Sequence, residues 1–269
     1  MAHNAKVAST TMANMMNQLL VVLAAGGFIK IYTGRQPGTA GGAVDDSNVL
    51  LVTLALANPA FGYASSGVST ANTISPGTAV VNGEASWFRM FAADGVTALL
   101  DGTAGVGSTF VLNLSSTTIT AGVPVTITSF VLNQPVGTPN VGIVATAANW
   151  MLFWIATAAS GGFIEIYTGT QPATPDDGVS GGDILLGTLA LGTPAFSLAV
   201  NGEITALPIA PSLVVADGSP AWFRMYESDS TTAILDGSCG AGEYDLVIES
   251  SNYVVGQKLQ VASLVILQN

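Results

Sequence analysis

The feature that most constrains the fold of this chain is an internal repeat. The segment GGFIKIYTG at Gly26–Gly34 recurs as GGFIEIYTG at Gly161–Gly169, with an offset of 135 residues. At the same offset four shorter motifs recur: Gln36-Pro37 as Gln171-Pro172, Thr53–Leu56 as Thr188–Leu191, Pro59–Phe61 as Pro194–Phe196, and Trp87–Met90 as Trp222–Met225. About half of the aligned positions from Gly26 to Gly102 are identical. The chain is therefore predicted to contain two copies of one domain.

The repeat also sets the expected domain boundaries. The first domain is predicted over residues 1–132, with an N-terminal arm and a helix before its strands. Residues 133–140 (NQPVGTPN) contain two prolines and one glycine, a composition typical of a linker. The second domain is predicted over residues 141–269.

The hydrophobic pattern of one repeat indicates a single helix followed by short strands. Apolar residues at helical spacing predict a helix over Met12–Ala25, which Gly26-Gly27 would end. Alternating or apolar runs bounded by turn residues predict six strands, at Phe28–Tyr32, Val49–Leu56, Trp87–Phe91, Thr97–Leu100, Thr109–Leu114 and Pro124–Leu132. This order predicts a mainly all-β fold: two tandem antiparallel β-sandwich or jelly-roll-like domains, each preceded by a short α-helix. A parallel α/β fold is disfavoured because helices do not alternate with the strands.

Composition narrows the range of partners. Hydrophobic residues make up 49% of the chain and charged residues only 9%, which suggests that much of the surface contacts other protein. The net charge is −11, and the six basic residues form no patch: Lys6, Lys30, Arg35, Arg89, Arg224 and Lys258. Nucleic acid and anionic membranes are therefore excluded as expected partners.

Two apolar segments resemble membrane signals. Leu19–Ala25 is similar to a signal-peptide core, and the uncharged run Val141–Ile164 is long enough to cross a bilayer. The two segments are counterparts in the repeat, and both lead into the same glycine pair and strand. A cleaved signal would have no reason to recur in mid-chain, so no membrane role is expected.

The residues that usually carry catalysis or bind metals are sparse. The one histidine, His3, lies in the N-terminal arm, so a triad with a positioned histidine is not expected. The one cysteine, Cys239, is interpreted as a small residue of a Gly-rich turn. The run Gly102–Gly107 has no following lysine and helix, so it is read as a turn and not as a phosphate-binding loop.

Carboxylate pairs are also present. Asp45-Asp46 and Asp176-Asp177 are expected to be solvated loop tips, and Asp94 with Asp101 is expected at hairpin ends. Nothing in these pairs indicates the convergence that glycosidase chemistry requires, and no calcium-loop pattern occurs. The chain is therefore predicted not to be an enzyme, with no catalytic, cofactor-binding or metal residues and no cofactor.

The strand Trp87–Phe91 has two possible interpretations. It could be an exposed aromatic–arginine hot spot for a partner. It could also be a core strand in which the Arg89 stem packs on Trp87 and the guanidinium pairs with a nearby aspartate. Recurrence in both copies favours the core, because a requirement of the fold recurs in each domain whereas a single binding contact need not.

These motifs resemble those of a family of small structural proteins of tailed-bacteriophage virions. The resemblance covers nearly all of each repeat and lies in GGFI-x-IY-x-G-x-x-P at Gly26–Pro37, in Pro59–Phe61, and in Trp87–Arg89 followed by Asp94-Gly95. It implies a capsid decoration (cement) protein that binds and stabilises the assembled head, and it supplies no catalytic residues. Unlike a simple member, this chain carries the domain twice.

The expected partners are the major capsid protein, other copies of this chain, or both, as a homo-oligomer on the particle. The expected location is the virion surface, after assembly in the host cytoplasm. A neck or tail component, and a carbohydrate-binding or adhesin module, remain alternatives. The arm Met1–Thr10 is expected to reach a neighbouring subunit. Contacts of the two copies are expected to diverge in two pairs of loops, Gly38–Asn48 against Ala173–Asp183, and Tyr63–Ala85 against Leu198–Pro220.

Overall fold

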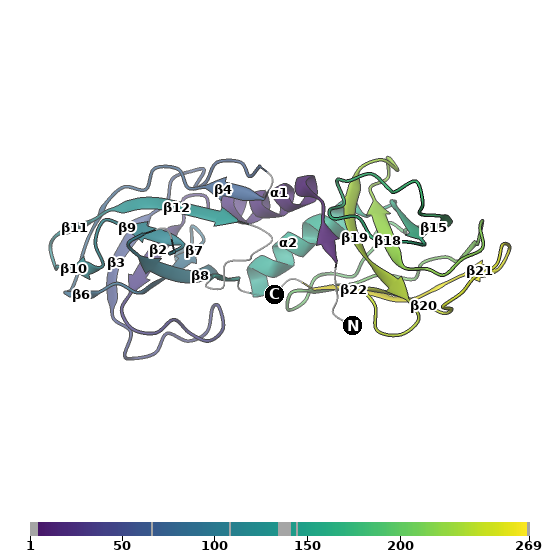
Figure 1. Cartoon of the computed structure of the whole chain (residues 1–269). Helices are drawn as coiled ribbons and strands as arrows, with labels where there is room; N and C mark the ends of the chain where they lie inside the picture. Colours follow the sequence, from purple (N-terminus) through teal and green to yellow (C-terminus); the bar gives the residue numbers. More distant parts are fainter. Residues whose placement is uncertain (1–4, 66, 108, 134–140, 144, 268–269) are drawn as a thin grey trace. The chain divides into compact units, whose positions relative to one another are not determined.

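The computed structural model describes residues 5–65, 67–107, 109–133, 141–143 and 145–267, and these residues fold mainly as β-strands (Figure 1). The chain divides into two compact units. One runs from Ala13 to Met151 and is called the first-repeat unit. The other combines the chain up to Met12 with the chain from Leu152 onward and is called the second-repeat unit.

Each repeat has a helix shortly before its glycine pair. In the first repeat, α1 (Ser9–Asn17) continues as a π-helical segment, η1 (Gln18–Leu23), and in the second repeat the helix is α2 (Ala145–Ala158). The predicted helix Met12–Ala25 therefore exists but begins and ends earlier. Its predicted apolar positions Met15, Met16, Leu19 and Leu20 are buried. Among the described residues, no helix is both long and apolar enough to span a membrane.

The glycine pair after each helix has a steric function. Gly26 and its counterpart Gly161 have φ values of +66° and +71°, a conformation that residues with a Cβ rarely adopt. A Cβ at Gly27 would lie 2.1 Å from the carbonyl oxygen of Phe91, and one at Gly162 would lie equally close to that of Tyr226. The pair therefore turns the chain and lets its backbone lie close to the carbonyl oxygen at the end of the neighbouring strand.

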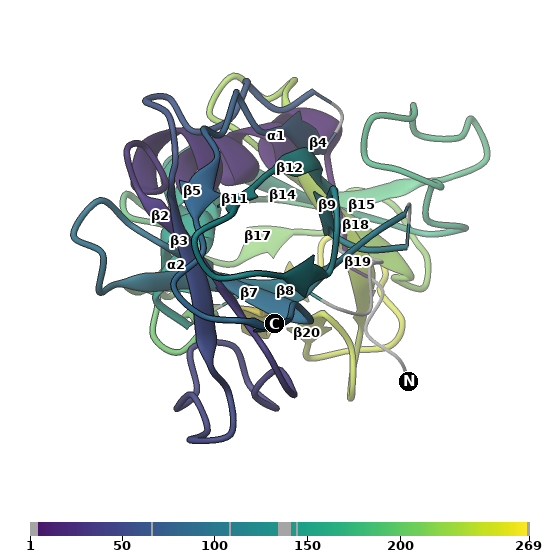
Figure 2. The same ribbon diagram turned by 90° about the vertical axis from the view of Figure 1, so that its left-hand side faces the viewer.

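The two units have main sheets with the same strand order. In the first-repeat unit the order is β3-β2-β7-β8-β9-β12-β4, formed by β2 (Phe28–Tyr32), β3 (Leu50–Ala55), β4 (Val68–Thr70), β7 (Trp87–Phe91), β8 (Ala98–Gly105), β9 (Leu112–Leu114) and β12 (Ile127–Asn133). In the second-repeat unit it is β15-β14-β18-β19-β20-β22-β16, formed by β14 (Phe163–Tyr167), β15 (Leu185–Ala190), β16 (Glu203–Thr205), β18 (Trp222–Tyr226), β19 (Ala233–Gly240), β20 (Leu246–Ile248) and β22 (Val261–Leu267). The first-repeat sheet curls, as its end-on view in Figure 2 shows. The pairings are antiparallel except for β8 with β9 and β19 with β20, which are parallel.

Short two-stranded pairs extend each unit beyond its main sheet. In the first-repeat unit β5 (Gly77–Thr78) pairs with β11 (Pro124–Val125), and β6 (Gly83–Glu84) pairs with β10 (Thr118–Ile119). In the second-repeat unit β17 (Ser212–Leu213) pairs with β21 (Lys258–Leu259). Each of these strands is only two residues long, too short for a hydrophobic period to reveal, and in the first-repeat unit only β11 lies within a predicted strand, Pro124–Leu132.

Two further strands lie on a sheet to which the rest of their repeat does not belong. β13 (Val141–Ile143) begins the second repeat, but it pairs with β8 in the first-repeat unit. β1 (Lys6–Val7) begins the first repeat, but it pairs with β19 in the second-repeat unit. The predicted boundaries at 1–132 and 141–269 therefore do not coincide with the compact units. Of the predicted linker 133–140, Asn133 ends β12 and the other residues lie outside the described ranges.

Several predicted boundaries need correction. Residues 102–105 of the predicted turn Gly102–Gly107 belong to β8, and Cys239 lies in β19 and not in a turn. The predicted strand Thr109–Leu114 is confined to Leu112–Leu114, and Pro124–Leu132 is divided into β11 and β12. In β8 and β19 the small residues that suggested a turn are tolerated inside a strand because a neighbouring strand supplies hydrogen bonds.

The core confirms one interpretation of the Trp–Phe–Arg strand. Trp87 is 1% exposed, and Phe88, Arg89 and Met90 are also buried. Phe88 packs edge-on against Phe130, which in turn packs against Phe61. The interpretation of this strand as an exposed hot spot is therefore wrong.

Candidate functional site

The centre of each main sheet contains a buried ion pair. Arg89 on β7 lies opposite Asp101 on β8, and its Nε and Nη2 donate to the two carboxylate oxygens at 2.6 and 2.7 Å. In the other unit Arg224 donates to Asp236 in the same way, with both distances 2.7 Å. The two aspartates are fully buried. Such bidentate pairs fix the orientation of both side chains.

The sequence placed Asp101 at a hairpin end, and this was wrong. Asp101 lies in the interior of β8, whereas its predicted companion Asp94 lies on the β7–β8 hairpin and accepts hydrogen bonds from Thr97 and from the backbone N–H of Val96. The spacing to Arg89 is the signal that could have found the pair: in an antiparallel hairpin, residues equally far from the turn lie opposite each other.

Each ion pair also holds a loop. Nη2 of Arg89 donates to the carbonyl oxygen of Gly42 at 2.9 Å, and the N–H of Gly41 donates to Asp101 at 3.2 Å. In the second-repeat unit Nη1 of Arg224 donates to the carbonyl oxygen of Asp177 at 2.9 Å. The two loops differ in sequence, but in each unit the equivalent arginine binds the loop through a backbone carbonyl oxygen. Because these hydrogen bonds use backbone atoms of the loop, the ion pair can hold the loop whatever its side chains are.

An aromatic stack completes the anchor. Trp87 stacks on Tyr32 with ring centroids 4.5 Å apart, and Trp222 stacks on Tyr167 at 4.6 Å. The indole N–H of Trp87 donates to the carbonyl oxygen of Thr33, and that of Trp222 donates to Thr168. The guanidinium carbon of Arg89 lies 5.5 Å from the Trp87 ring. These contacts place the start of each loop beside the ion pair.

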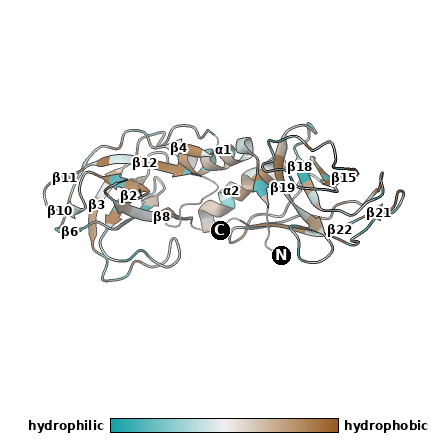
Figure 3. Ribbon diagram, in the orientation of Figure 1, coloured by the Kyte–Doolittle hydropathy of each residue, from teal (hydrophilic) through white to brown (hydrophobic). Residues whose placement is uncertain are grey.

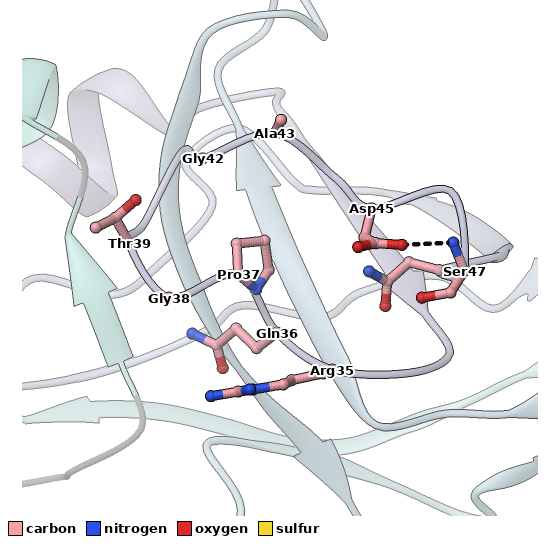
Figure 4. A pocket seen from close by; sticks show the side chains of 10 residues that line it. Arg35, Gln36, Pro37, Gly38, Thr39, Gly42, Ala43, Asp45 and Ser47 are labelled. Carbon is pink, nitrogen blue, oxygen red and sulfur yellow. Dashed lines mark hydrogen bonds between the residues drawn. The ribbon is translucent and has the colours of Figure 1, made fainter.

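The loop of the first-repeat unit lines an open pocket of about 420 Å³ (Figure 4). Arg35, Gln36, Pro37 and Asn48 contribute to its wall, and Asp45 accepts a hydrogen bond from the N–H of Ser47. That hydrogen bond lowers the pKa of the exposed Asp45 carboxyl. Asp45 therefore matches the predicted solvated loop tip.

Asp176 and Asp177 of the second repeat are exposed, as predicted, but each also accepts hydrogen bonds that the sequence did not predict. Asp176 accepts hydrogen bonds from the N–H of Ser9, at 3.0 and 3.3 Å, at the start of α1. Asp177 accepts from the N–H and the hydroxyl of Thr174, which lower the pKa of its carboxyl. A carboxylate at a helix N-terminus satisfies an otherwise unpaired N–H group and interacts favourably with the helix dipole. Asp176 therefore binds the N-terminal arm, a function that sequence position alone does not reveal.

The N-terminal arm forms further contacts beside the second ion pair. Lys6 lies opposite Asp236 in the β1–β19 register, and its ammonium donates to the carbonyl oxygen of Pro172 at 2.7 Å. Burial raises the pKa of the Asp236 carboxyl, an effect that Arg224 and Lys6 oppose. The arm was expected to reach a neighbouring subunit, but its described part lies on β19 of the same chain.

Two of the candidate residues from the sequence remain, the histidine His3 and the cysteine Cys239. His3 lies outside the described residues. Cys239 is buried in β19, and burial raises the pKa of its thiol. Among the described residues, no group of three or more His, Cys, Asp or Glu side chains could hold a metal ion.

In comparisons with known proteins, no family model, no curated protein and no solved structure matches the chain.

Proposed function

We propose that this chain is a structural protein of a tailed-bacteriophage virion, and specifically a decoration protein that binds and stabilises the assembled head. The proposal rests on the resemblance of its motifs to that family and on the surface that the fold presents. A protein that binds only the assembled shell stabilises it by mass action. This function needs a rigid scaffold and a contact surface, and it needs no active site.

The observation that carries the proposal is an exposed apolar cluster on the second-repeat unit, formed by Leu213, Val215, Val254 and Val255 and called here the apolar tip. Leu213 is 65% exposed and Val215 is 61% exposed. Backbone hydrogen bonds hold the segments together: Val214 donates to the carbonyl oxygen of Gln257, and Gly256 donates to that of Val214. Exposed apolar clusters of this kind commonly mark protein-binding surfaces.

The first-repeat unit presents the same backbone arrangement. Ala79 donates to the carbonyl oxygen of Val123, and Gly122 donates to that of Ala79. Val80, the counterpart of Val215, is 70% exposed, and Val123 is exposed as well. Each unit therefore offers an apolar surface on the same part of its fold. Figure 3 shows few strongly hydrophilic positions over either unit, as the 9% of charged residues requires.

We infer in addition that each unit is a β-sandwich of jelly-roll type and that the chain arose by tandem duplication. The identical strand order of the two sheets supports the duplication. The proposed partners are the major capsid protein and other copies of this chain, and the proposed location is the virion surface after assembly in the host cytoplasm. The carbohydrate-binding alternative gains no support from Trp87 and Trp222, which recur in both repeats, because both are buried.

Binding to heads that lack the protein tests this function. The wild-type chain should cosediment with such heads and raise the temperature at which they release DNA. Val215→Asp combined with Val254→Asp should abolish cosedimentation, whereas Val96→Asp, at a hairpin residue that is 79% exposed and lies outside the tip, should not. No binding to heads would refute the proposal. A copy number in purified particles that matches a six-fold or twelve-fold ring would indicate the neck or tail instead.

A further inference from the structure

The N-terminal arm is bound to the second-repeat unit through several independent contacts. β1 pairs with β19 in the register Lys6↔Asp236 and Val7↔Leu235, and the N–H of Ala8 donates to the carbonyl oxygen of Ile234 at 2.9 Å. Ala8 is itself 1% exposed. Together with the contacts from Lys6 to Pro172 and from Ser9 to Asp176, these hydrogen bonds define a strand-binding slot on the edge of β19.

The covalent route to this slot is distinctive. The arm continues into α1, whose residues from Ala13 onward belong to the first-repeat unit. The chain returns to the second-repeat unit only at Leu152, within α2. The arm and its slot are therefore separated along the chain by the whole first-repeat unit.

The same kind of slot exists on the other sheet, where a different segment fills it. β13 pairs with β8 through Val141↔Gly102, Gly142↔Asp101 and Ile143↔Leu100. β13 follows β12 closely in the sequence, and both belong to the first-repeat unit. Each slot is thus filled from within its own unit, but only the arm is separated from its slot along the chain by the other unit.

From these contacts we propose that the β19 slot accepts the arm of a second copy of this chain, so that copies exchange arms. An exchanged arm makes the same hydrogen bonds and buries the same side chains, and only the connectivity changes. The balance between the closed and exchanged forms then depends on the local concentration of arms relative to the effective concentration of the tethered arm, which is set by the first-repeat unit that connects the arm to its own slot. At low concentration each chain binds its own arm, and at high concentration the copies become linked through exchanged arms.

A cysteine cross-link between β1 and β19 tests the exchange. Val7 and Leu235 face each other, and because the adjacent pair Ala8 and Ile234 is hydrogen-bonded, this is a non-hydrogen-bonded pair with close Cβ atoms. Val7→Cys and Leu235→Cys are introduced separately, in a Cys239→Ala background. Leu235 is 1% exposed, so its replacement thiol can be reached only by a strand in the slot.

The two single variants are mixed, oxidised at increasing total concentration and run on non-reducing gels. A covalent heterodimer should form several-fold above the level given by Val7→Cys mixed with the surface variant Val96→Cys, and its yield should rise with concentration. The double variant Val7→Cys/Leu235→Cys should close within one chain when dilute and form a ladder when concentrated.

Two results would overturn the proposal. If the double variant closes internally but the mixture gives no more heterodimer than the control, the arm does not exchange. If the double variant does not close at all, β1 does not occupy the slot. The test does not depend on binding to a phage head, so its failure is separate from failure of the proposed function.

Discussion

Removal of one partner from the buried ion pair should destabilise a unit far more than removal of both. Arg89→Met leaves Asp101 fully buried with one described hydrogen bond, from the N–H of Gly41, in place of three. It also frees the carbonyl oxygen of Gly42 from its contact with the guanidinium. Breaking a buried pair in this way typically costs about 3–5 kcal/mol, against a total stability of roughly 5–15 kcal/mol for a domain.

The double variant Arg89→Met/Asp101→Leu removes both charges from the interior. No carboxylate then remains buried without its partner, so the double variant should be more stable than Arg89→Met by at least about 2 kcal/mol. Arg35→Met is the matched control, because Arg35 is exposed in the same unit, and it should change stability by less than about 0.5 kcal/mol.

Urea unfolding gives the total change, and amide hydrogen exchange of peptides that cover β7, β8 and residues 38–48 locates it. Arg89→Met should increase exchange in the loop as well as in the strands, because the arginine binds both. A cost below about 1 kcal/mol for Arg89→Met, or a double variant no more stable than the single one, would refute the reasoning that the Asp101 carboxylate is costly in this core without its arginine. Arg224→Met repeats the test in the other unit.

Three further predictions concern single positions. Gly27→Ala would place its Cβ 2.1 Å from a backbone carbonyl oxygen of β7 and should abolish soluble expression, whereas Gly38→Ala, with open space around its Cβ, should express normally. The buried Cys239 thiol, whose pKa is raised by desolvation, should resist a thiol reagent such as a disulfide dye in the native protein and react after unfolding; rapid native labelling would contradict its burial. Hydrogen bonds from Thr97 lower the pKa of the Asp94 carboxyl, so NMR should show it titrating below its pKa in the unfolded chain. The stabilisation that these bonds give is present above the unfolded pKa and is lost as the pH falls through the folded pKa. An ordinary pKa for Asp94 in the native protein would refute this.

The sequence predicted the elements whose causes are local. β2 and β7 were found with their observed bounds, because glycines bound the alternating run Phe28–Tyr32 and recurrence marks Trp87–Phe91. The end of the first helix before Gly26 followed from the conformation that only glycine adopts easily. The burial of Arg89 beside an aspartate was also predicted, but the identity of that aspartate was not.

The candidate site was less predictable, because its parts come from distant segments. Asp176 is solvated as expected, but its hydrogen bond with the backbone of Ser9 was not predicted. The N-terminal arm was expected to reach a neighbouring subunit, but its residues 6 and 7 form a strand on β19. Two-residue strands have no hydrophobic period, so only the edge that receives them reveals where they pair.

The amino-acid sequence by itself determined the repeat, the all-β character and the requirement for glycine at Gly26, because periodicity and backbone sterics act between near neighbours. The tertiary structure alone decided which sheet receives each N-terminal strand, and which carboxylate each buried arginine binds. Those choices depend on unpaired backbone groups at a sheet edge and on unpaired charges in a core, and such groups are satisfied by whatever partner the fold brings close.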